Sequence, residues 1–257
     1  GAVRMRPTLL PGLLDAARFN LNHQRRDLKL FEVGKVFAAR QSEDSLPTER
    51  EMFGIVMTGG ETLQKHVEPV RQIDFYDAKG AVEAALEAVG FPAAEFRAAE
   101  ILHLRPGQSA EILLDGGIVG YLGRVNENIS SGYKFRTPVY VAEIDLESVL
   151  SRNVPGVFYR PLPKYPSITR DVSFLIGRDR TFDDIRSAVI DQGLELCRNV
   201  GFVGIFEGKG VGAGKRSLTV RLEYRSDERT LVEDEVASAH GAIIETLSNT
   251  LGIVPRG

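Results

Sequence analysis

A basic, glycine-rich segment comes closest in residue type and spacing to a known chemical motif. It runs from Gly208 to Arg216 and reads GKGVGAGKR. A nucleotide-binding P-loop needs glycine six residues before its lysine and a hydroxyl residue after it, where this chain has Lys209 and Arg216. A strand pattern follows, whereas a P-loop leads into a helix. The segment is therefore interpreted either as a plain hairpin connection or as a loop whose Lys209, Lys215, Arg216 and backbone amides contact a phosphate backbone.

An aromatic residue lies just before this loop. Phe206 ends a predicted strand of a C-terminal sheet. A ring on an exposed sheet can stack an unpaired nucleic-acid base, which contributes about 1–3 kcal/mol per base. A place in the hydrophobic core is the simpler interpretation of the residue pattern alone. Both interpretations stay open at this point.

The remaining reactive side chains do not assemble into a catalytic or metal site. The single cysteine, Cys197, excludes an internal disulfide and a cysteine-based zinc site, and it is interpreted as a small buried apolar residue. The acidic groups Asp183-Asp184 and Glu233-Asp234-Glu235 open predicted helices, where carboxylates favour the positive end of the helix dipole. No hydrolase, metalloprotease or triad motif is present. The histidines are scattered, at His23, His66, His103 and His240.

Length and composition predict a two-domain globular protein of the cytoplasm. The 257 residues exceed one typical domain, and the apolar and charged fractions of 43% and 26% are ordinary. The net charge of −3 argues against a surface devoted entirely to nucleic acid, so an RNA contact would have to be focal. No apolar run reaches the roughly 20 residues of a membrane helix, and no signal peptide opens the chain.

Residue periodicity predicts a mostly antiparallel sheet with flanking helices in the first part of the chain. Thr8 is predicted to cap a helix from Leu9 to about Asn22, and Asp77 to open a second helix that Gly90 ends. The turn at Asp115-Gly116-Gly117 predicts a hairpin. A polar loop is expected at 41–50. The expected strands are a largely buried one at Leu28–Phe37 and others at Phe53–Thr58 and Val139–Leu146.

The second part of the chain follows a proline-rich strap at 153–166 and predicts a β-α-β-β-α-β, ferredoxin-like plan. Thr181 is expected to cap its first helix. Thr230, with Glu233 three residues on, is expected to cap the second helix through a capping box. The predicted strands are Ile168–Ile176, Cys197–Phe206, Ser217–Tyr224 and a short one at Ile253-Val254. The expected domains are therefore 1–152 and 167–257, joined by the strap.

Several segments in one order resemble the beta subunit of bacterial phenylalanyl-tRNA synthetase. They span nearly the whole chain, although no single one is decisive. The segments are Met5–Leu14, Leu30–Phe37, Asp74–Gly80, His103–Ala110, Gly120–Gly123, Tyr165–Asp171, Phe206–Leu218 and Arg229–Leu231.

The resemblance implies an α+β fold: an antiparallel class II synthetase-like domain without catalysis, then a ferredoxin-fold anticodon-binding domain. The implied partners are tRNA(Phe) and the alpha subunit, in an α2β2 heterotetramer. Aminoacylation would occur in the alpha subunit, so this chain would bind no cofactor, and ATP and Mg²⁺ would bind elsewhere in the full enzyme. The family's subunit is much longer, and its editing domain and other modules would precede Gly1.

Two departures from the family pattern bear on function. After Gly34-Lys35-Val36-Phe37, Ala38 stands where active class II domains have a phosphate-binding arginine, and Arg40 stands where they have an acid. ATP activation by this chain is therefore not expected. In the last domain Gly204 replaces the usual aspartate that would bond a guanine edge. Either stacking then dominates recognition, or Glu207 compensates.

The resemblance thus implies that the chain binds the tRNA(Phe) anticodon and supports subunit assembly. Phe206 would stack the first anticodon base and Ser217 would contact it. A group of basic residues would position the RNA backbone. One alternative is a purely structural subunit-interaction module, and another is an enzyme whose first domain binds a nucleotide or amino acid. The basic residues are Lys209, Lys215, Arg216 and Arg170.

Overall fold

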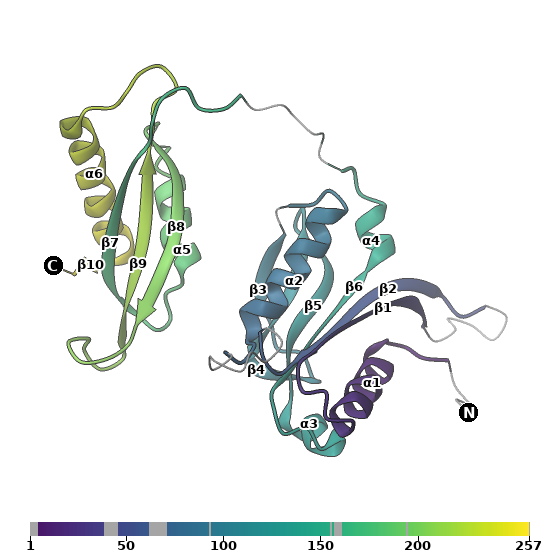
Figure 1. Cartoon of the computed structure of the whole chain (residues 1–257). Helices are drawn as coiled ribbons and strands as arrows, with labels where there is room; N and C mark the ends of the chain where they lie inside the picture. The colour runs from purple at the N-terminus through teal and green to yellow at the C-terminus, as the bar shows by residue number, and fades with distance from the viewer. Residues whose placement is uncertain are drawn as a thin grey trace. The chain divides into compact units, whose positions relative to one another are not determined.

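The chain forms two compact units, which are described separately below. A computed structural model describes residues 5–38, 46–61, 71–92, 94–154, 156, 161–193 and 195–256. Unit 1 comprises Gly1–Val157 and unit 2 comprises Phe158–Gly257 (Figure 1). The predicted α+β class with antiparallel sheets is confirmed. Part of the predicted strap, at 155 and 157–160, lies outside the described residues, as do His66 and Arg40.

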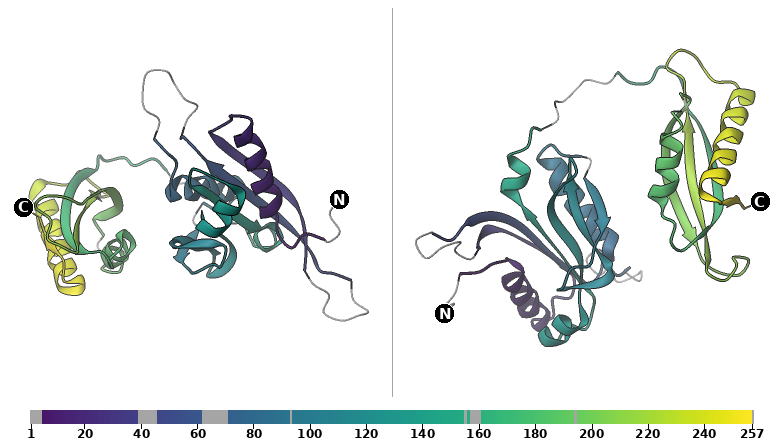
Figure 2. Two further views of the ribbon diagram at one scale, coloured as in Figure 1. Left: turned by 90° about the horizontal axis from the view of Figure 1, so that it is seen from below. Right: turned by 180° about the vertical axis from the view of Figure 1, so that it is seen from behind.

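Unit 1 is built on a six-stranded antiparallel sheet in the order β1-β2-β6-β5-β4-β3. Its strands are β1 (Leu28–Phe37), β2 (Glu49–Thr58), β3 (Glu95–Ala98), β4 (Leu104–Leu114), β5 (Gly117–Val125) and β6 (Val139–Asp145). Its helices are α1 (Leu10–Asn22), α2 (Phe75–Ala88), α3 (Glu127–Tyr133) and α4 (Leu146–Leu150). The packing clusters place α1 and α3 on one face of the sheet and α2 and α4 on the other (Figures 1 and 2).

Helix α1 is held to the sheet at its N-terminus by a buried carboxylate. The predicted apolar stripe packs as expected, with Leu10, Leu13, Leu14 and Ala17 buried. Glu143 of β6 accepts hydrogen bonds from the backbone N–H of Leu9 at 2.6 Å and from the Thr8 hydroxyl. The helix is assigned from Leu10 with Leu9 as its N-cap, and the Thr8 hydroxyl accepts from the Leu10 N–H at 3.2 Å, so the predicted capping contact of Thr8 is present.

Strand β1 has the predicted bounds but not the predicted burial. Its side chains alternate, and Phe31 is 72% exposed. The physical reason is its place at the edge of the sheet, where one face is not fully covered by helices. The β4–β5 hairpin forms as predicted, because Asp115 and Gly116 both adopt the positive φ of a two-residue turn.

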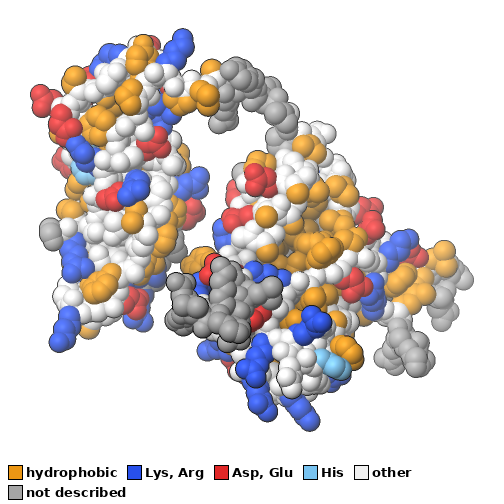
Figure 3. All heavy atoms as spheres, viewed as in Figure 1, with side chains coloured by type: hydrophobic (Ala, Val, Ile, Leu, Met, Phe, Trp, Pro, Cys, Tyr) orange, Lys and Arg blue, Asp and Glu red, His pale blue; other side chains and the backbone are white. Residues whose placement is uncertain are grey.

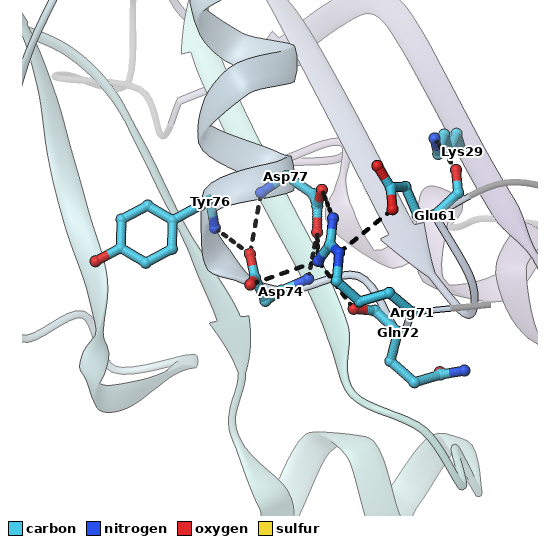
Figure 4. Close-up of polar contacts among 7 residues, drawn as sticks. All are labelled: Lys29, Glu61, Arg71, Gln72, Asp74, Tyr76 and Asp77. Atoms are coloured by element: carbon cyan, nitrogen blue, oxygen red, sulfur yellow. Dashed lines mark hydrogen bonds and ion pairs between the residues drawn. The ribbon is translucent and has the colours of Figure 1, made fainter. Parts of the chain in front are cut away.

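Helix α2 begins two residues before the predicted start at Asp77. Asp74 is the N-cap and accepts from the backbone of Tyr76 and Asp77, while the Asp77 carboxylate accepts from the backbone of Asp74. Arg71 binds both oxygens of Asp77 at 2.9 and 2.7 Å and also pairs with Glu61 (Figure 4). This network fixes the start of the helix against the end of β2, and the predicted left-handed end at Gly90 is confirmed.

Unit 2 has a four-stranded antiparallel sheet in the order β10-β7-β9-β8, which is the ferredoxin-like plan. Both helices pack on one face of the sheet, and the core lies between the helices and the sheet (Figure 2). The opposite face is open. Its elements are β7 (Ile168–Gly177), α5 (Phe182–Ile190), β8 (Cys197–Phe206), β9 (Lys215–Tyr224), α6 (Glu233–Leu251) and β10 (Val254–Pro255).

The two helix starts of unit 2 differ in how well they were predicted. Thr181 caps α5 and forms a capping box with Asp184, so this predicted cap is confirmed. The predicted box at Thr230 is wrong, because α6 begins at Glu233. The Glu235 carboxylate instead accepts from the N–H of Val232 at 3.2 Å and is held there by Arg229.

None of the helices within the described ranges is long and apolar enough to cross a membrane.

Candidate nucleic-acid interface

Strand register places a defined row of side chains on the open face of unit 2. Ser217 of β9 pairs with Phe206 of β8 on one side and with Leu175 of β7 on the other. Val254 of β10 pairs in turn with Leu175. Residues directly opposite in antiparallel strands point to the same face. The alternate residues of β9, such as Leu218, are fully buried against the helices, so the row lies on the uncovered face.

Phe206 is the half-exposed aromatic of this row. Its side chain is 50% exposed, so the interpretation as a core residue is wrong. The loop after β8 folds back against the ring: a Cβ built on Gly208 would lie 2.8 Å from the ring's Cζ atom. Glycine at 208 therefore lets the backbone approach the ring edge, while the ring keeps an accessible surface.

Ser217 lies in the same row but is covered. It is only 3% exposed, so the hydroxyl that the resemblance assigns to a base contact is not accessible in this structure. In the next row, Gly204 pairs with Thr219, whose hydroxyl is 2.8 Å from that of Ser173. No atom lies within 4 Å of a Cβ built on Gly204. Because Gly204 has no side chain, space stays open next to Phe206 and beside the hydroxyl groups of Thr219 and Ser173.

The predicted basic residues divide between the two faces. Lys215 pairs with Gly177 and, like Ser217 two residues further on, points to the open face, and Lys209 is exposed in the loop. Arg216 points to the helix side, and its guanidinium donates to the carbonyl of Arg180 at 2.6 Å. Arg170 pairs with Leu222, which points to the helices, and forms an ion pair with Glu233 of α6. The structure therefore brings Lys209 and Lys215 toward the Phe206 end and leaves Arg216 and Arg170 on the other face.

Glu207 is engaged elsewhere. Its carboxylate accepts from Arg178 at 2.9 Å. A role for Glu207 in place of the absent acid at Gly204 would need this ion pair to open. The pair is exposed and therefore weak, so its opening is energetically accessible.

Arg256 is a residue at this site that the sequence interpretation missed. Its guanidinium carbon lies 5.5 Å from the centroid of the Phe206 ring, over the ring. The sequence signal was a basic residue two positions after the short final strand predicted at Ile253-Val254. Fifty residues of sequence separate the two side chains, and the strand order brings them together.

The other reactive side chains do not form a second site. Burial raises the pKa of the Cys197 thiol, which disfavours the nucleophilic thiolate. The His103 ring lies edge-on to Tyr121, and burial lowers its pKa. Within the described ranges no three His, Cys, Asp or Glu side chains are grouped as metal ligands. Ala38, whose backbone pairs with Thr48, offers no charge to a phosphate.

The fold and this surface define a class of protein: a six-stranded antiparallel α+β domain combined with a ferredoxin-like domain that presents an aromatic ring on its open face. Residues 3–146 match the family model of the phenylalanyl tRNA synthetase beta chain CLM domain. Residues 163–256 match that of the ferredoxin-fold anticodon binding domain. The chain therefore belongs to the phenylalanyl-tRNA synthetase beta chain family.

Curated relatives match along nearly the whole chain. The phenylalanine–tRNA ligase beta subunit of Symbiobacterium thermophilum is 35% identical over 95% of this chain and 27% of its own length. That of Bacillus subtilis is 33% identical over 98% of this chain and 31% of its own length. The chain thus spans less than a third of either relative. A pyrrolysyl tRNA synthetase of Desulfitobacterium hafniense has a TM-score of 0.44 and 17% identity over 56% of this chain and 48% of its own, too low to carry an argument.

Proposed function

We propose that unit 2 binds the anticodon loop of tRNA(Phe) and stacks the first anticodon base on Phe206. The observation that carries this proposal is the half-exposed ring on the open sheet face of a unit that matches an anticodon-binding family. A large apolar ring on an open face loses contact with water when a base covers it. Such stacking contributes about 1–3 kcal/mol per base.

The neighbouring residues supply complementary contacts in this proposal. Lys215 and Lys209 attract the phosphates on either side of the stacked base. Gly204 leaves room for the base, and the hydroxyl of Ser217 becomes available once the side chains above it move. Arg216 and Arg170 face away, so they contribute at most to the general electrostatic field.

Unit 1 would assemble with the alpha subunit of the synthetase, which would carry out ATP-dependent attachment of phenylalanine. In the α2β2 enzyme, ATP and Mg²⁺ would then bind outside this chain. The support within unit 1 is its exposed apolar surface: Phe19 of α1 is 63% exposed beside a groove lined by Arg18 and Lys134. Figure 3 shows a further hydrophobic area on the viewed face of unit 1, between α2 and α4.

The test compares two phenylalanines of one strand. Phe206 and Phe202 of β8 are 50% and 53% exposed, but Phe202 lies on the helix side, edge-on to Phe182. Binding is measured to a tRNA(Phe) anticodon stem-loop and to the same loop with its first anticodon base changed, at low and moderate salt. Phe206→Ala is expected to abolish the preference for the native loop, while Phe202→Ala retains it. Both proteins should melt near the temperature of the unsubstituted chain.

The same experiment decides between this proposal and a purely structural role. Equal binding of the unsubstituted chain to both loops, with a steep loss on adding salt, would mean nonspecific phosphate attraction alone. A chain that captures the alpha subunit but shows no loop preference would be an assembly module. Titration with ATP and phenylalanine addresses the enzyme alternative, and no binding heat is expected from either.

A further inference from the structure

Arg256 is anchored by its backbone to the sheet edge beside the proposed base site. Strand β10 pairs with β7, with Val254 opposite Leu175. The backbone N–H of Arg256 then donates to the carbonyl of Ser173 at 2.7 Å. Since Val254 belongs to the open-face row and Arg256 is two residues further along, the Arg256 side chain also rises from the open face.

From this edge the arginine side chain reaches across the sheet. Strands β7 and β9 lie between β10 and β8, yet the guanidinium carbon is 5.5 Å from the Phe206 centroid. One guanidinium nitrogen also lies 3.4 Å from the Cβ position of Gly210 in the loop. The side chain therefore passes over the middle of the row, where Ser217 is 3% exposed. The guanidinium thus lies against both the Phe206 ring and the loop after β8, while the position next to Gly204 stays open.

We propose that Arg256 forms the second wall of the base site, so that a nucleobase is held between the Phe206 ring and the Arg256 guanidinium. This inference rests on the proposed anticodon-binding function of unit 2. A guanidinium is planar, always charged and weakly hydrated, so it stacks on a base face as an aromatic ring does. A lysine ammonium has the same charge but no plane to stack.

The present spacing fits a site that opens slightly on binding. A base between two planes requires them to be about 7 Å apart, because each stacked layer occupies about 3.4 Å. The guanidinium carbon now lies 5.5 Å from the ring centroid, less than this separation, so the side chain must move outward to admit a base. A rotamer change in a long side chain supplies this movement while the backbone stays tied to β7.

The experiment uses the 257-residue chain with two RNA probes at low salt. The first is the tRNA(Phe) anticodon stem-loop, and the second is the same loop with an abasic sugar at the first anticodon position. The variants are Arg256→Ala, Arg256→Lys and the control Arg186→Ala. Arg186 lies on α5 and pairs with Asp183, so its removal changes the net charge equally on the opposite side of the sheet. Phe206→Ala is measured in parallel.

Arg256→Ala is expected to weaken native-loop binding by about tenfold, within the range of a desolvated cation–π contact, and to leave abasic-loop binding unchanged. Arg256→Lys should behave like Arg256→Ala, and Arg186→Ala like the unsubstituted chain. An equal loss of affinity for both loops, or full rescue by lysine, would mean that Arg256 contacts a phosphate. Either result would refute stacking of the base between Phe206 and Arg256. Tighter binding by Arg256→Ala would mean that the arginine blocks the ring.

The Phe206 variant separates this inference from the function on which it rests. If Phe206→Ala loses discrimination between the loops and Arg256→Ala does not, the anticodon-binding function stands and the role of Arg256 is refuted. If neither variant changes the discrimination, both proposals fail. Thermal melting of all variants excludes unfolding, and both side chains lie on the exposed sheet face away from the core of unit 2.

Discussion

Replacing Glu143 should detach the N-terminus of α1 from the sheet of unit 1. The carboxylate is 3% exposed and accepts hydrogen bonds from three donors. These are the Thr8 hydroxyl at 2.9 and 2.7 Å from its two oxygens, the Leu9 N–H at 2.6 Å, and the Tyr121 hydroxyl. Burial, and then the charge of Glu143, raise the pKa of Tyr121, so this phenol stays protonated and remains a donor.

The size of the effect follows from the fate of these donors. Each hydrogen bond to a charged group contributes about 1.5–3 kcal/mol, but the three are not additive, and removing the carboxylate also removes a buried charge. For Glu143→Ala we therefore expect a loss of about 3–5 kcal/mol in the free energy of unfolding of unit 1, because three donors lose their acceptor and each unsatisfied buried donor costs about 1–3 kcal/mol. Glu143→Gln keeps an acceptor oxygen and should cost about 1–2 kcal/mol, because only the charge assistance is lost.

The assay must distinguish the two units, since they can unfold separately. Hydrogen exchange at increasing urea concentration, read by mass spectrometry, reports peptides from 9–22 and from α6 in one sample. The chain has no tryptophan, so fluorescence would be a weak probe. The α6 peptides are the internal reference, and Glu87→Ala on the exposed surface of α2 should change stability by less than about 0.5 kcal/mol. Exchange in 9–22 that Glu143→Ala leaves unaltered would refute the reasoning, as would an equal loss in α6.

Two further predictions concern unit 2. Gly208→Ala places a methyl group 2.8 Å from the Phe206 ring and should weaken stem-loop binding severalfold with little change in melting temperature; unchanged affinity would show that the ring can move freely. Burial, and then the charge of Arg170, lower the pKa of His240, whose ring is 2.9 Å from the Tyr224 hydroxyl. Below pH about 6.5 the unfolded chain therefore binds a proton that the folded unit resists, so unit 2 should lose stability as pH falls through this value and His240→Gln should flatten the profile. A profile that His240→Gln leaves unchanged would assign the titration to another group.

Much of the fold could be predicted from local patterns. Periodicity gave the bounds of β1 and β8 to the residue, and the Asp115-Gly116 turn predicted the β4–β5 hairpin. Such features depend on residues within a few positions of one another, because side-chain alternation and turn geometry are local properties. The order of elements in unit 2 likewise predicted its ferredoxin-like topology.

The start of α6 was missed for a local reason, because Glu235, held by Arg229, caps the helix in place of the Thr230 motif. Other features depend on distant residues. Glu143, more than 130 residues away in sequence, holds the start of α1. The exposure of Phe31 depends on which strand lies at the sheet edge. Local propensity cannot contain this information, because long-range packing overrides it.

The candidate site shows the same division. The sequence by itself determined that Phe206 ends a strand beside a basic loop, and that Ala38 and Gly204 depart from the family pattern. Only the tertiary structure decided that Phe206 faces away from the core, that Arg170 and Arg216 point to the other face, and that Arg256 lies over the ring. The physical reason is strand register: a shift of one residue moves every side chain of a strand to the opposite face, and register is set by pairing between distant segments.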